Sequence, residues 1–550
     1  MERPPCAIGI DFGTASARTL LLDLESGDEL SVAEISYEHG VIDEILPGAQ
    51  VRLPLDWALH DPDDYLATLQ KGIARVLQDA PGAASSVIGI GVDATSCTVL
   101  PASADGAPLT RSALRNRPHA WAKLWKHHAA QPVADRLNEV AAARSEAWLS
   151  RYGGRISSEW YFPKLIEIWL EDKEVYEAAD RFVEVVDWVV WQLTGTERRS
   201  ACPAAYKALW AEEGGVPSAE FFEAAYPGFR APWDKLGKDF YPLGTNAGHL
   251  RPELAARLGL PESVVVAVGN VDSFVSFPGA GAEGADEFVM VVGTSICDLV
   301  VRDAEILLEG ITGVAKDGIV PGLFGYEAGQ PAVGDMLGWF ATRMLGGEAG
   351  TTLPALEAAA AALAPAATGL VALDWWNGNR SVLADADLSG VIAGLNLQST
   401  AADIYRCLLE SIAFGNHEII GNFRRAGFSF GEIVACGGIA ERSPLLMQLL
   451  ADVSGLPVRV PGSSQVPARG SALFGAVAAG PGRGGFAEIA AAARTLRPPT
   501  AQRYRPRPEA TATYARVYAI WRNLHENLGR GHADWLHGLK TLKRAAEAQA

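Results

Sequence analysis

The sequence predicts an α/β protein built from two lobes, and three observations lead to this. The chain has 550 residues, which is more than one hydrophobic core usually organises. Short β-branched runs alternate with stretches of helical spacing, as in sheets that are flanked by helices. A second strand-rich set starts after residue 260. We therefore expect an N-terminal lobe over 1–262 and a C-terminal lobe over 263–550, joined by a short hinge.

The first lobe opens with strands that end in aspartates. The apolar run 7–11 ends at Asp11 and is followed by the small-residue turn Phe12-Gly13-Thr14, which predicts a strand and a tight turn. A later run, 87–92 (VIGIGV), stops at Asp93. Neighbouring strands of one sheet would bring both aspartates to a shared edge.

Helices are expected between and after these strands. Apolar residues recur at helical spacing over 61–76, with Asp61-Pro62 as cap and first turn. Residues 112–260 are rich in aromatic and charged residues, and we interpret them as helical insertions that cover the first lobe. Helices are predicted there over 163–170 and 175–193.

The strand pattern then starts over. Strand-like runs cover 264–272, 288–295 and 297–303, and the turn Gly293-Thr294-Ser295 repeats the Gly-Thr of the first lobe. This is a faint internal repeat. Further on, a strand over 431–436 runs into Gly437-Gly438 and is followed by a helix and another strand, which is an α/β unit.

The composition of the chain limits the binding partners and the cellular compartment that we expect for it. The net charge of −18 repels phosphate backbones and no block of basic residues counters it, so we expect no nucleic-acid partner. Six cysteines are spread along the chain without a C-x-x-C pair, which favours reduced thiols and a cytoplasmic location. No secretory signal core and no apolar stretch of about 20 residues is found, so neither export nor membrane insertion is expected.

The glycine turns have the features of phosphate-binding sites. Phosphoryl transfer needs backbone donors for the phosphates, a carboxylate to organise magnesium and a base near the acceptor. Gly13 and Thr14 let the backbone approach a phosphate, and we expect Asp11 to hold the metal through water. Standing alone, this turn would equally fit a plain hairpin. The turn Gly293-Thr294-Ser295 offers a second cradle, so that two cradles can clamp one polyphosphate.

Gly437-Gly438 offers a third element, because a nucleoside can lie against bare backbone at a strand end. By itself a Gly-Gly pair is more often a structural turn.

Taken together, these segments resemble the FGGY family of carbohydrate kinases, within the actin, sugar-kinase and heat-shock ATPase superfamily. The resemblance covers nearly the whole chain. It rests on IGIDFGTASAR (8–18), GIGVDATS (89–96), GNVDS (269–273), GTSICD (293–298) and ACGGIAERSPLLMQLLAD (435–452). It implies two ribonuclease-H-like lobes with the active site in the cleft between them.

Within the family the chain is most similar to the L-ribulokinases. The segments that carry this are SSEWYFPKL (157–165), YKALW (206–210), PGLFGYEAGQPAVGD (321–335) and DWWNGNR (374–380). The implied reaction is the transfer of phosphate from ATP to L-ribulose, giving L-ribulose 5-phosphate, a step of L-arabinose use. Magnesium with ATP and a homodimer are implied as well.

The resemblance also assigns roles to single residues. Asp272 would be the general base that accepts the proton of the sugar hydroxyl. Ala94, Lys207 and Glu327 would line the ketopentose through a backbone contact, an ammonium group and a carboxylate. Without the resemblance, Asp272 would equally fit a turn cap, Lys207 a solvated surface charge and Glu327 a salt-bridged loop acid.

Four positions depart from the familiar pattern, and they lie at the sugar pocket and the phosphate turn: Ala15, Ala94, Tyr206 and Ser273. No charged catalytic group is lost, but the sugar preference is left open. The alternatives are a kinase of another ketopentose or pentitol, such as D-ribulose, xylulose or ribitol. The alternatives from another class are a non-catalytic sugar-binding regulator and an ATP-driven conformational protein.

Overall fold

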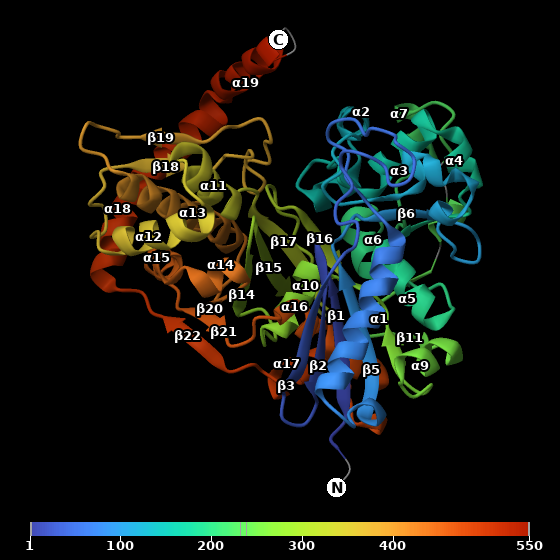
Figure 1. Cartoon of the computed structure of the whole chain (residues 1–550). Coiled ribbons are helices and arrows are strands. Elements are labelled where there is room, and N and C mark those ends of the chain that lie inside the picture. Colours follow the sequence, from blue (N-terminus) through green and yellow to red (C-terminus); the bar gives the residue numbers. More distant parts are fainter. Residues whose placement is uncertain (1–2, 231–232, 238, 548–550) are drawn as a thin grey trace.

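The computed structural model describes residues 3–230, 233–237 and 239–547. Over these ranges the chain forms two α/β lobes that lie side by side, as predicted (Figure 1). The N-terminal half of the chain and the C-terminal half each supply most of one lobe. No helix within the described ranges combines the length and the apolar character that a bilayer crossing needs.

The first lobe is built on a mixed sheet in the order β11-β12-β5-β1-β2-β3, with β13 also paired to β5. The first three strands form an antiparallel meander, whereas β5 and β12 run parallel to β1. The strands are β1 (Cys6–Phe12), β2 (Ser16–Asp23), β3 (Glu29–Ser36), β5 (Val87–Ala94), β11 (Asn246–His249), β12 (Val265–Ala267) and β13 (Asn270–Val271). β1 and β5 confirm the two predicted strands, and each extends one residue past its aspartate, to Phe12 and Ala94.

The second lobe is built on a sheet in the order β16-β17-β15-β14-β20-β21-β22. Its strands are β14 (Glu287–Val292), β15 (Ile296–Arg302), β16 (Gly313–Lys316), β17 (Phe324–Gln330), β20 (Glu432–Cys436), β21 (Val458–Pro461) and β22 (Thr500–Tyr504). The series β17-β15-β14-β20-β21-β22 has the same pairing directions as β3-β2-β1-β5-β12-β11. The internal repeat expected from the Gly-Thr turns is therefore confirmed in the topology.

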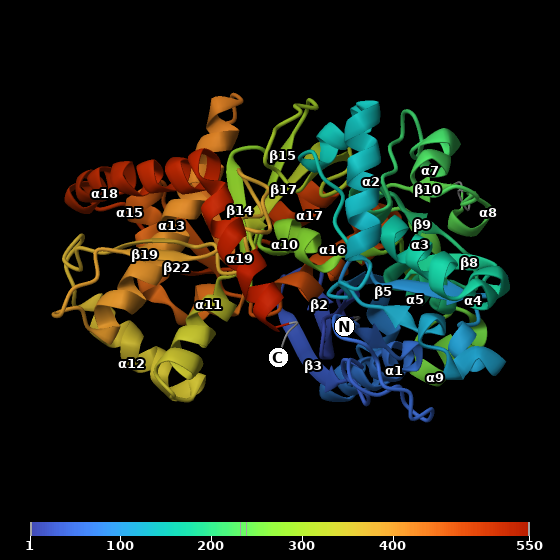
Figure 2. The same cartoon turned by 90° about the horizontal axis from the view of Figure 1, so that it is seen from above.

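Helices form layers on both sides of each sheet (Figures 1 and 2). The outer face of the first sheet shares a core with α1 (Pro62–Asp79), α5 (Val185–Thr194) and α9 (Pro252–Leu258). A middle layer shares a core with residues of both sheets and consists of α10 (Asp272–Gly279), α16 (Val466–Ala479) and α17 (Ile489–Thr495). The outer face of the second sheet is covered by α11 (Gly334–Trp339), α12 (Ala349–Ala361), α13 (Ala401–Arg425), α15 (Pro444–Ser454) and α18 (Pro508–Glu526).

A separate subdomain lies on the first lobe, at the upper right of Figure 1. Its small sheet, β4-β7-β6-β8, consists of β4 (Leu59–His60), β6 (Val99–Ala102), β7 (Ala122–Lys123) and β8 (Arg181–Glu184). Its helices include α2 (Gln131–Arg144), α3 (Tyr161–Glu171), α4 (Lys173–Ala178), α6 (Ala201–Lys207) and α7 (Ala219–Ala225). The helical insertion expected over 112–260 is thus a mixed structure.

The prediction of a single helix over 175–193 is wrong. The strand β8 interrupts it between α4 and α5 and pairs antiparallel with β6. The apolar residues of this stretch fit a helical period and a strand period alike. Pairing with the distant strand β6 therefore decides that residues 181–184 form a strand.

The first sheet continues past the boundary expected at residue 262. Both β12 and β13 pair with β5, although a second lobe was expected to begin with them. A run of β-branched residues predicts a strand but does not tell which sheet it joins. The chain also returns later, because α16 packs against β1 and β5 of the first sheet.

Glycines make the contact between α16 and the first sheet very close. A Cβ at Gly9 of β1 would lie 1.7 Å from the carbonyl oxygen of Ala468, and one at Gly91 of β5 would lie 1.8 Å from that of Ser471. No side chain fits at either position. The helix therefore lies backbone to backbone on the sheet.

Candidate active site

Two carboxylates end neighbouring strands of the first sheet. Asp11 on β1 and Asp93 on β5 are register partners in a parallel pair, and both are buried. Asp11 Oδ2 accepts a hydrogen bond from Arg18 Nη1 at 3.1 Å, while Asp93 Oδ2 accepts one from the hydroxyl of Ser471 on α16. Burial and the charge of Asp11 hold the pKa of Asp93 well above its ordinary value. The predicted shared edge is confirmed.

Asp272 lies beside this edge. It is the first residue of α10 and directly follows β13, whose Val271 pairs with Ala94 at the end of β5. Its Oδ1 accepts the N–H of Ser273 at 2.7 Å. Burial, and next the charge of Asp11, raise the pKa of Asp272 to about 7. A carboxyl group that titrates near neutrality is suited to accept a proton from a substrate hydroxyl.

Lys207 and Glu327 form an ion pair that joins the two lobes. Lys207 ends α6 of the first lobe, Glu327 lies on β17 of the second, and Nζ stands 2.9 Å from Oε2. Both residues are buried. Burial alone would lower the pKa of Lys207, but the charge of Glu327, the charge of Cys97 and the hydrogen bond to Glu327 together outweigh it and raise that pKa. Both charges also act on Asp272, so three of the predicted sugar residues lie together, and Lys207 is not a solvated surface charge.

The first Gly-Thr turn is held by a side chain that the sequence did not reveal. Gly13 and Thr14 connect β1 to β2, and Trp125 of the subdomain donates its indole N–H to Thr14 Oγ1 at 3.1 Å. The hydroxyl hydrogen of Thr14 stays available to donate to a ligand. No local pattern signals this contact, because the two residues are 111 positions apart.

A second unpredicted residue is the buried Lys164 of α3. Its ammonium group donates to the carbonyl oxygens of Cys97 and Leu124. These carbonyls belong to the loop after Ala94 and to the segment before Trp125. Lys164 therefore ties together two stretches that border the site, and its place in the segment 157–165 was the only signal for it.

The glycines of the second lobe meet at one sheet edge. Strands β14 and β20 are parallel and pair Val291 with Cys436, so the turns Gly293-Thr294-Ser295 and Gly437-Gly438 leave the sheet side by side. Gly437 has φ +94°, and a Cβ there would lie 2.7 Å from the carbonyl oxygen of Val292. Gly438 begins the short helix α14 (Gly438–Arg442).

The helix α10 connects the two groups of residues. It packs against β5 and β13 of the first sheet and against β14 and β15 of the second. Asp272, at its first position, therefore lies where the first-lobe carboxylates and the second-lobe turns approach each other.

The carboxylates fit a magnesium ion that is held mostly by its nucleotide. Within the part of the chain that the structure describes, no group of three or more His, Cys, Asp and Glu residues forms a metal site. Asp93 Oδ1 is buried without a hydrogen-bond partner among the described residues. Magnesium in phosphoryl-transfer sites takes one or two carboxylates, with water and phosphate oxygens as its other ligands. Asp11 and Asp93 offer such a pair.

The comparison with known proteins agrees with this geometry. Two family models match the chain: the N-terminal domain of the FGGY family of carbohydrate kinases over residues 6–279, and its C-terminal domain over residues 288–479. The chain belongs to the FGGY family of carbohydrate kinases. As a member it is an ATP-dependent sugar kinase, with two lobes of the actin and sugar-kinase type.

Relatives within the FGGY family are similar over nearly their full length. A ribulokinase of Shouchella clausii is 46% identical over 553 residues, which cover 99% of each chain. A ribulokinase of Anoxybacillus flavithermus is 45% identical over 551 residues, 98% of each chain. Among solved structures, a xylulose kinase of Rhodospirillum rubrum superposes with a TM-score of 0.80 at 22% identity, covering 97% of this chain and all of its own. The last likeness concerns the FGGY fold alone.

Proposed function

We propose that this FGGY kinase transfers the γ-phosphoryl group of ATP to L-ribulose and forms L-ribulose 5-phosphate, a step in the use of L-arabinose. The relatives that are 41–46% identical to it carry the name ribulokinase. The observation that carries the mechanism is Asp272, a carboxyl group with a pKa raised to about 7, beside an ion pair that reaches across the lobes.

The sugar is held by groups of both lobes. Lys207 and Glu327, 2.9 Å apart, offer three N–H donors and a carboxylate to adjacent hydroxyl groups, and the backbone of Ala94 adds a third contact. Asp272 accepts the proton of the attacking hydroxyl, whose oxygen forms the new bond to phosphorus. The bond between this phosphorus and the bridging oxygen of ADP breaks.

The triphosphate is held by the turns. Gly13 and Thr14 donate from the first lobe, and Gly293, Thr294 and Ser295 donate from the second. Gly437-Gly438 leaves room for the nucleoside. Asp11, with Asp93 beside it, would hold Mg²⁺ through water, and the cation supplies positive charge against the phosphate oxygens.

Sugar binding also draws the lobes together in this proposal. Because the Lys207–Glu327 pair joins the two lobes, a polyol that bonds to both side chains favours the closed arrangement. Closure excludes water and directs the phosphoryl group to the sugar.

The test is an ADP-release assay with magnesium-ATP and a panel of L-ribulose, D-ribulose, L- and D-xylulose, ribitol and glycerol, with the product identified by NMR. Selective formation of L-ribulose 5-phosphate supports the proposal. Preference for another polyol keeps the kinase and replaces the substrate. Absence of any sugar-dependent turnover would favour a regulator or an ATP-driven conformational protein.

The base is tested in the same assay by Asp272→Asn. Turnover falls by roughly 100- to 10,000-fold, the range for loss of a general base, while sugar binding measured by calorimetry persists. The matched control is Asp298→Asn, because Asp298 is another aspartate whose pKa is raised by burial, to about 8, and it accepts a hydrogen bond from Asn416. Unchanged turnover in Asp272→Asn excludes the role.

Location and assembly are part of the proposal. All six cysteines are free thiols, which supports a reducing, cytoplasmic environment. The homodimer is tested by light scattering on the purified protein, where a monomer mass would reject it.

A further inference from the structure

The helix that begins with Asp272 is held at its other end by the second lobe. α10 ends at Gly279, and the segment 280–286 leads from it into β14. The helix has only eight residues, so a shift of its C-terminal end moves Asp272 as well. What binds Ala280 therefore affects where the proposed base stands.

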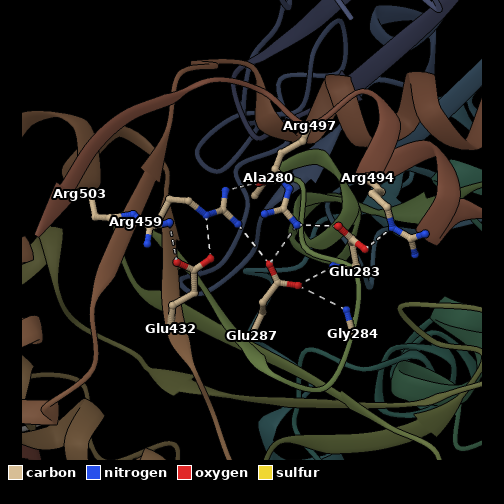
Figure 3. Close-up of polar contacts among 9 residues, drawn as sticks. All are labelled: Ala280, Glu283, Gly284, Glu287, Glu432, Arg459, Arg494, Arg497 and Arg503. Atoms are coloured by element: carbon tan, nitrogen blue, oxygen red, sulfur yellow. Dashed lines mark hydrogen bonds and ion pairs between the residues drawn. The ribbon is translucent and has the colours of Figure 1, made fainter. Parts of the chain in front are cut away.

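Arg459 binds that end. Its side chain is 1% exposed, and it reaches from β21 across the sheet (Figure 3). Nη1 donates to the carbonyl oxygen of Ala280 at 2.9 Å, Nε donates to Glu432 at 3.0 Å, and Nη2 donates to Glu287 at 3.3 Å. The guanidinium group thus joins the end of α10 to the first residues of β14 and β20.

The glutamates around Arg459 hold the connecting segment. Glu287 Oε2 accepts the N–H of Glu283 at 2.6 Å, and Arg497 binds Glu283 at 2.7 Å. Arg494 binds the other oxygen of Glu283 at 2.6 Å (Figure 3). The segment is therefore fixed from α17 on one side and from β21 on the other.

Two further chain segments that connect the second sheet with the middle helices lie next to this cluster, one from β21 to α16 and one from α17 to β22. The N–H of Gly462, just after β21, donates to the carbonyl oxygen of Pro499, just before β22, at 2.6 Å. The segment after α10 also lies close to the segment after α17, because a Cβ at Gly281 would lie 2.6 Å from Arg497 Cγ. Arg459 thus lies next to three chain segments that connect the middle helices with the second sheet, namely 280–286, 462–465 and 496–499. A buried ion pair by itself adds little net stability. Stability alone therefore does not explain why Arg459 is placed here.

We propose that Arg459 is a positioning residue for the phosphoryl transfer. It fixes the C-terminal end of α10 against β14 and β20, and thereby sets Asp272 relative to Gly293 and Gly437 at the far ends of the same strands. Lysine cannot replace it, since one ammonium group does not span the three acceptors in a plane. The inference rests on the proposed role of Asp272.

The experiment compares Arg459→Lys with Arg406→Lys in the full-length enzyme. Arg406 is the matched control, because it is equally buried and bonds a glutamate, Glu410, and the carbonyl oxygen of Ala360 near the end of α12. Arg459→Lys lowers kcat by roughly 10- to 100-fold, the effect of a displacement of about 1 Å. It also releases more ADP than sugar phosphate, because water reaches the misaligned phosphoryl group. Arg406→Lys keeps the ratio of the two products at that of the parent.

Hydrogen exchange gives a readout that does not depend on activity. Amides of α10 exchange faster in Arg459→Lys than in the parent, while those of α13 are unchanged. If Arg459→Lys matches Arg406→Lys in α10 exchange and in the product ratio, the inference is wrong. A loss of folded enzyme alone would lower both products together and leave their ratio intact, which also overturns it.

Two further variants keep the test decisive if Arg459→Lys does not fold. Glu287→Gln and Glu432→Gln are at partly exposed side chains, and each weakens one bond of Arg459; a normal product ratio in both contradicts the inference. The proposed function fails separately, through absence of sugar-dependent turnover in the parent enzyme, and the proposed role of Asp272 fails through full turnover in Asp272→Asn. In either case the anchoring of α10 is still read from hydrogen exchange.

Discussion

The two sheets share one topology but differ in the residues at their active edges. In the first lobe, Asp11 and Asp93 are register partners on the central parallel strands. In the second lobe, Val291 stands two positions before the Gly-Thr turn, as Asp11 does in the first lobe. Its register partner on the parallel strand is Cys436. One edge thus carries two carboxylates, and the other carries apolar side chains next to bare glycine backbone.

This difference divides the chemistry between the lobes. The first lobe supplies the charged groups that act on the metal and on the proton, and the second lobe supplies backbone against which a nucleotide can lie. A repeat in topology is therefore not a repeat in function. The ion pair between Lys207 and Glu327 is the point at which both lobes contribute a charge to the same pocket.

The strongest test of this division is Asp11→Asn. We expect turnover to fall by roughly 100-fold, about 3 kcal/mol, because a carboxylate that organises the metal is lost. The equivalent change in the second lobe, Val291→Ala, keeps turnover near that of the parent enzyme. Steady-state kinetics at saturating magnesium-ATP compares the two, and equal losses would contradict the division.

The glycines give the next largest effect, this time on folding. Gly437→Ala places a Cβ at φ +94° and 2.7 Å from a carbonyl oxygen, which costs about 1–3 kcal/mol of unfolding free energy. At Gly293 the nearest atom to a Cβ is 3.9 Å away, so Gly293→Ala folds normally and weakens only ATP binding. Denaturant unfolding and the KM for ATP separate the two variants. An unaltered KM in Gly293→Ala would exclude this turn from the nucleotide site.

The pH dependence locates the titrating carboxylate. The pKa of Asp272 is raised from 3.8 to about 7, and the ionised form is the base. Hence kcat/KM is constant above about pH 7 and falls about tenfold for each pH unit below it, or 1.4 kcal/mol. In Asp11→Asn the residual activity persists to lower pH, since the charge of Asp11 helps to raise this pKa. In Asp298→Asn the profile stays as in the parent; a shifted profile there would place the titration in the second lobe.

The same shift predicts a change in stability. A carboxyl group with a raised pKa stabilises the fold in its neutral form, and this contribution is lost as the pH rises from about 4 through about 7. Asp272→Asn lacks the buried charge. Its midpoint of thermal unfolding should therefore exceed that of the parent at pH 8, and the gain should shrink toward pH 5.

The smallest effect concerns the support of the two turns. The first turn is held by the indole of Trp125, whereas the second is held by backbone, through the N–H of Val333 on the carbonyl of Thr294 at 2.9 Å. Trp125→Phe removes one hydrogen bond, about 1 kcal/mol, and raises the KM for ATP about fivefold. Trp148→Phe is the control, because its indole binds Glu146 away from the turn. Equal KM values in the two variants would deny Trp125 this role.

The elements near the chain's glycines and aspartates could be predicted because their signals are local. A β-branched run that stops near Asp11 or Gly437 defines a strand and its end to within one residue, and the shared edge of Asp11 and Asp93 follows from parallel pairing. The resemblance supplied Lys207 and Glu327, which neither period nor spacing distinguishes from surface charges. Their roles, like that of Asp272, stay predictions until the kinetics are measured.

What could not be predicted depends on contacts between distant segments. The strand β8 inside an expected helix, the place of β12 in the first sheet and the bond from Trp125 to Thr14 all depend on partners far away in the sequence. The sequence predicts Asp93 at the sheet edge. It does not predict that Oδ1 of Asp93 is buried without a hydrogen-bond partner in the described part of the chain, because this follows from the packing of α16 on the sheet. Such features follow from tertiary packing and have no local pattern.

The backbone contact between α16 and the first sheet has a consequence for protein synthesis. Gly9 and Gly91 leave a slot that only the backbone of residues 466–479 fills. A ribosome that has completed residue 279 has therefore synthesised every strand of the first sheet, yet one face of that sheet stays bare until the later helix emerges. The first lobe of this kinase therefore cannot finish folding until α16 has been synthesised, most of a second lobe later, and its apolar sheet face stays uncovered in the meantime.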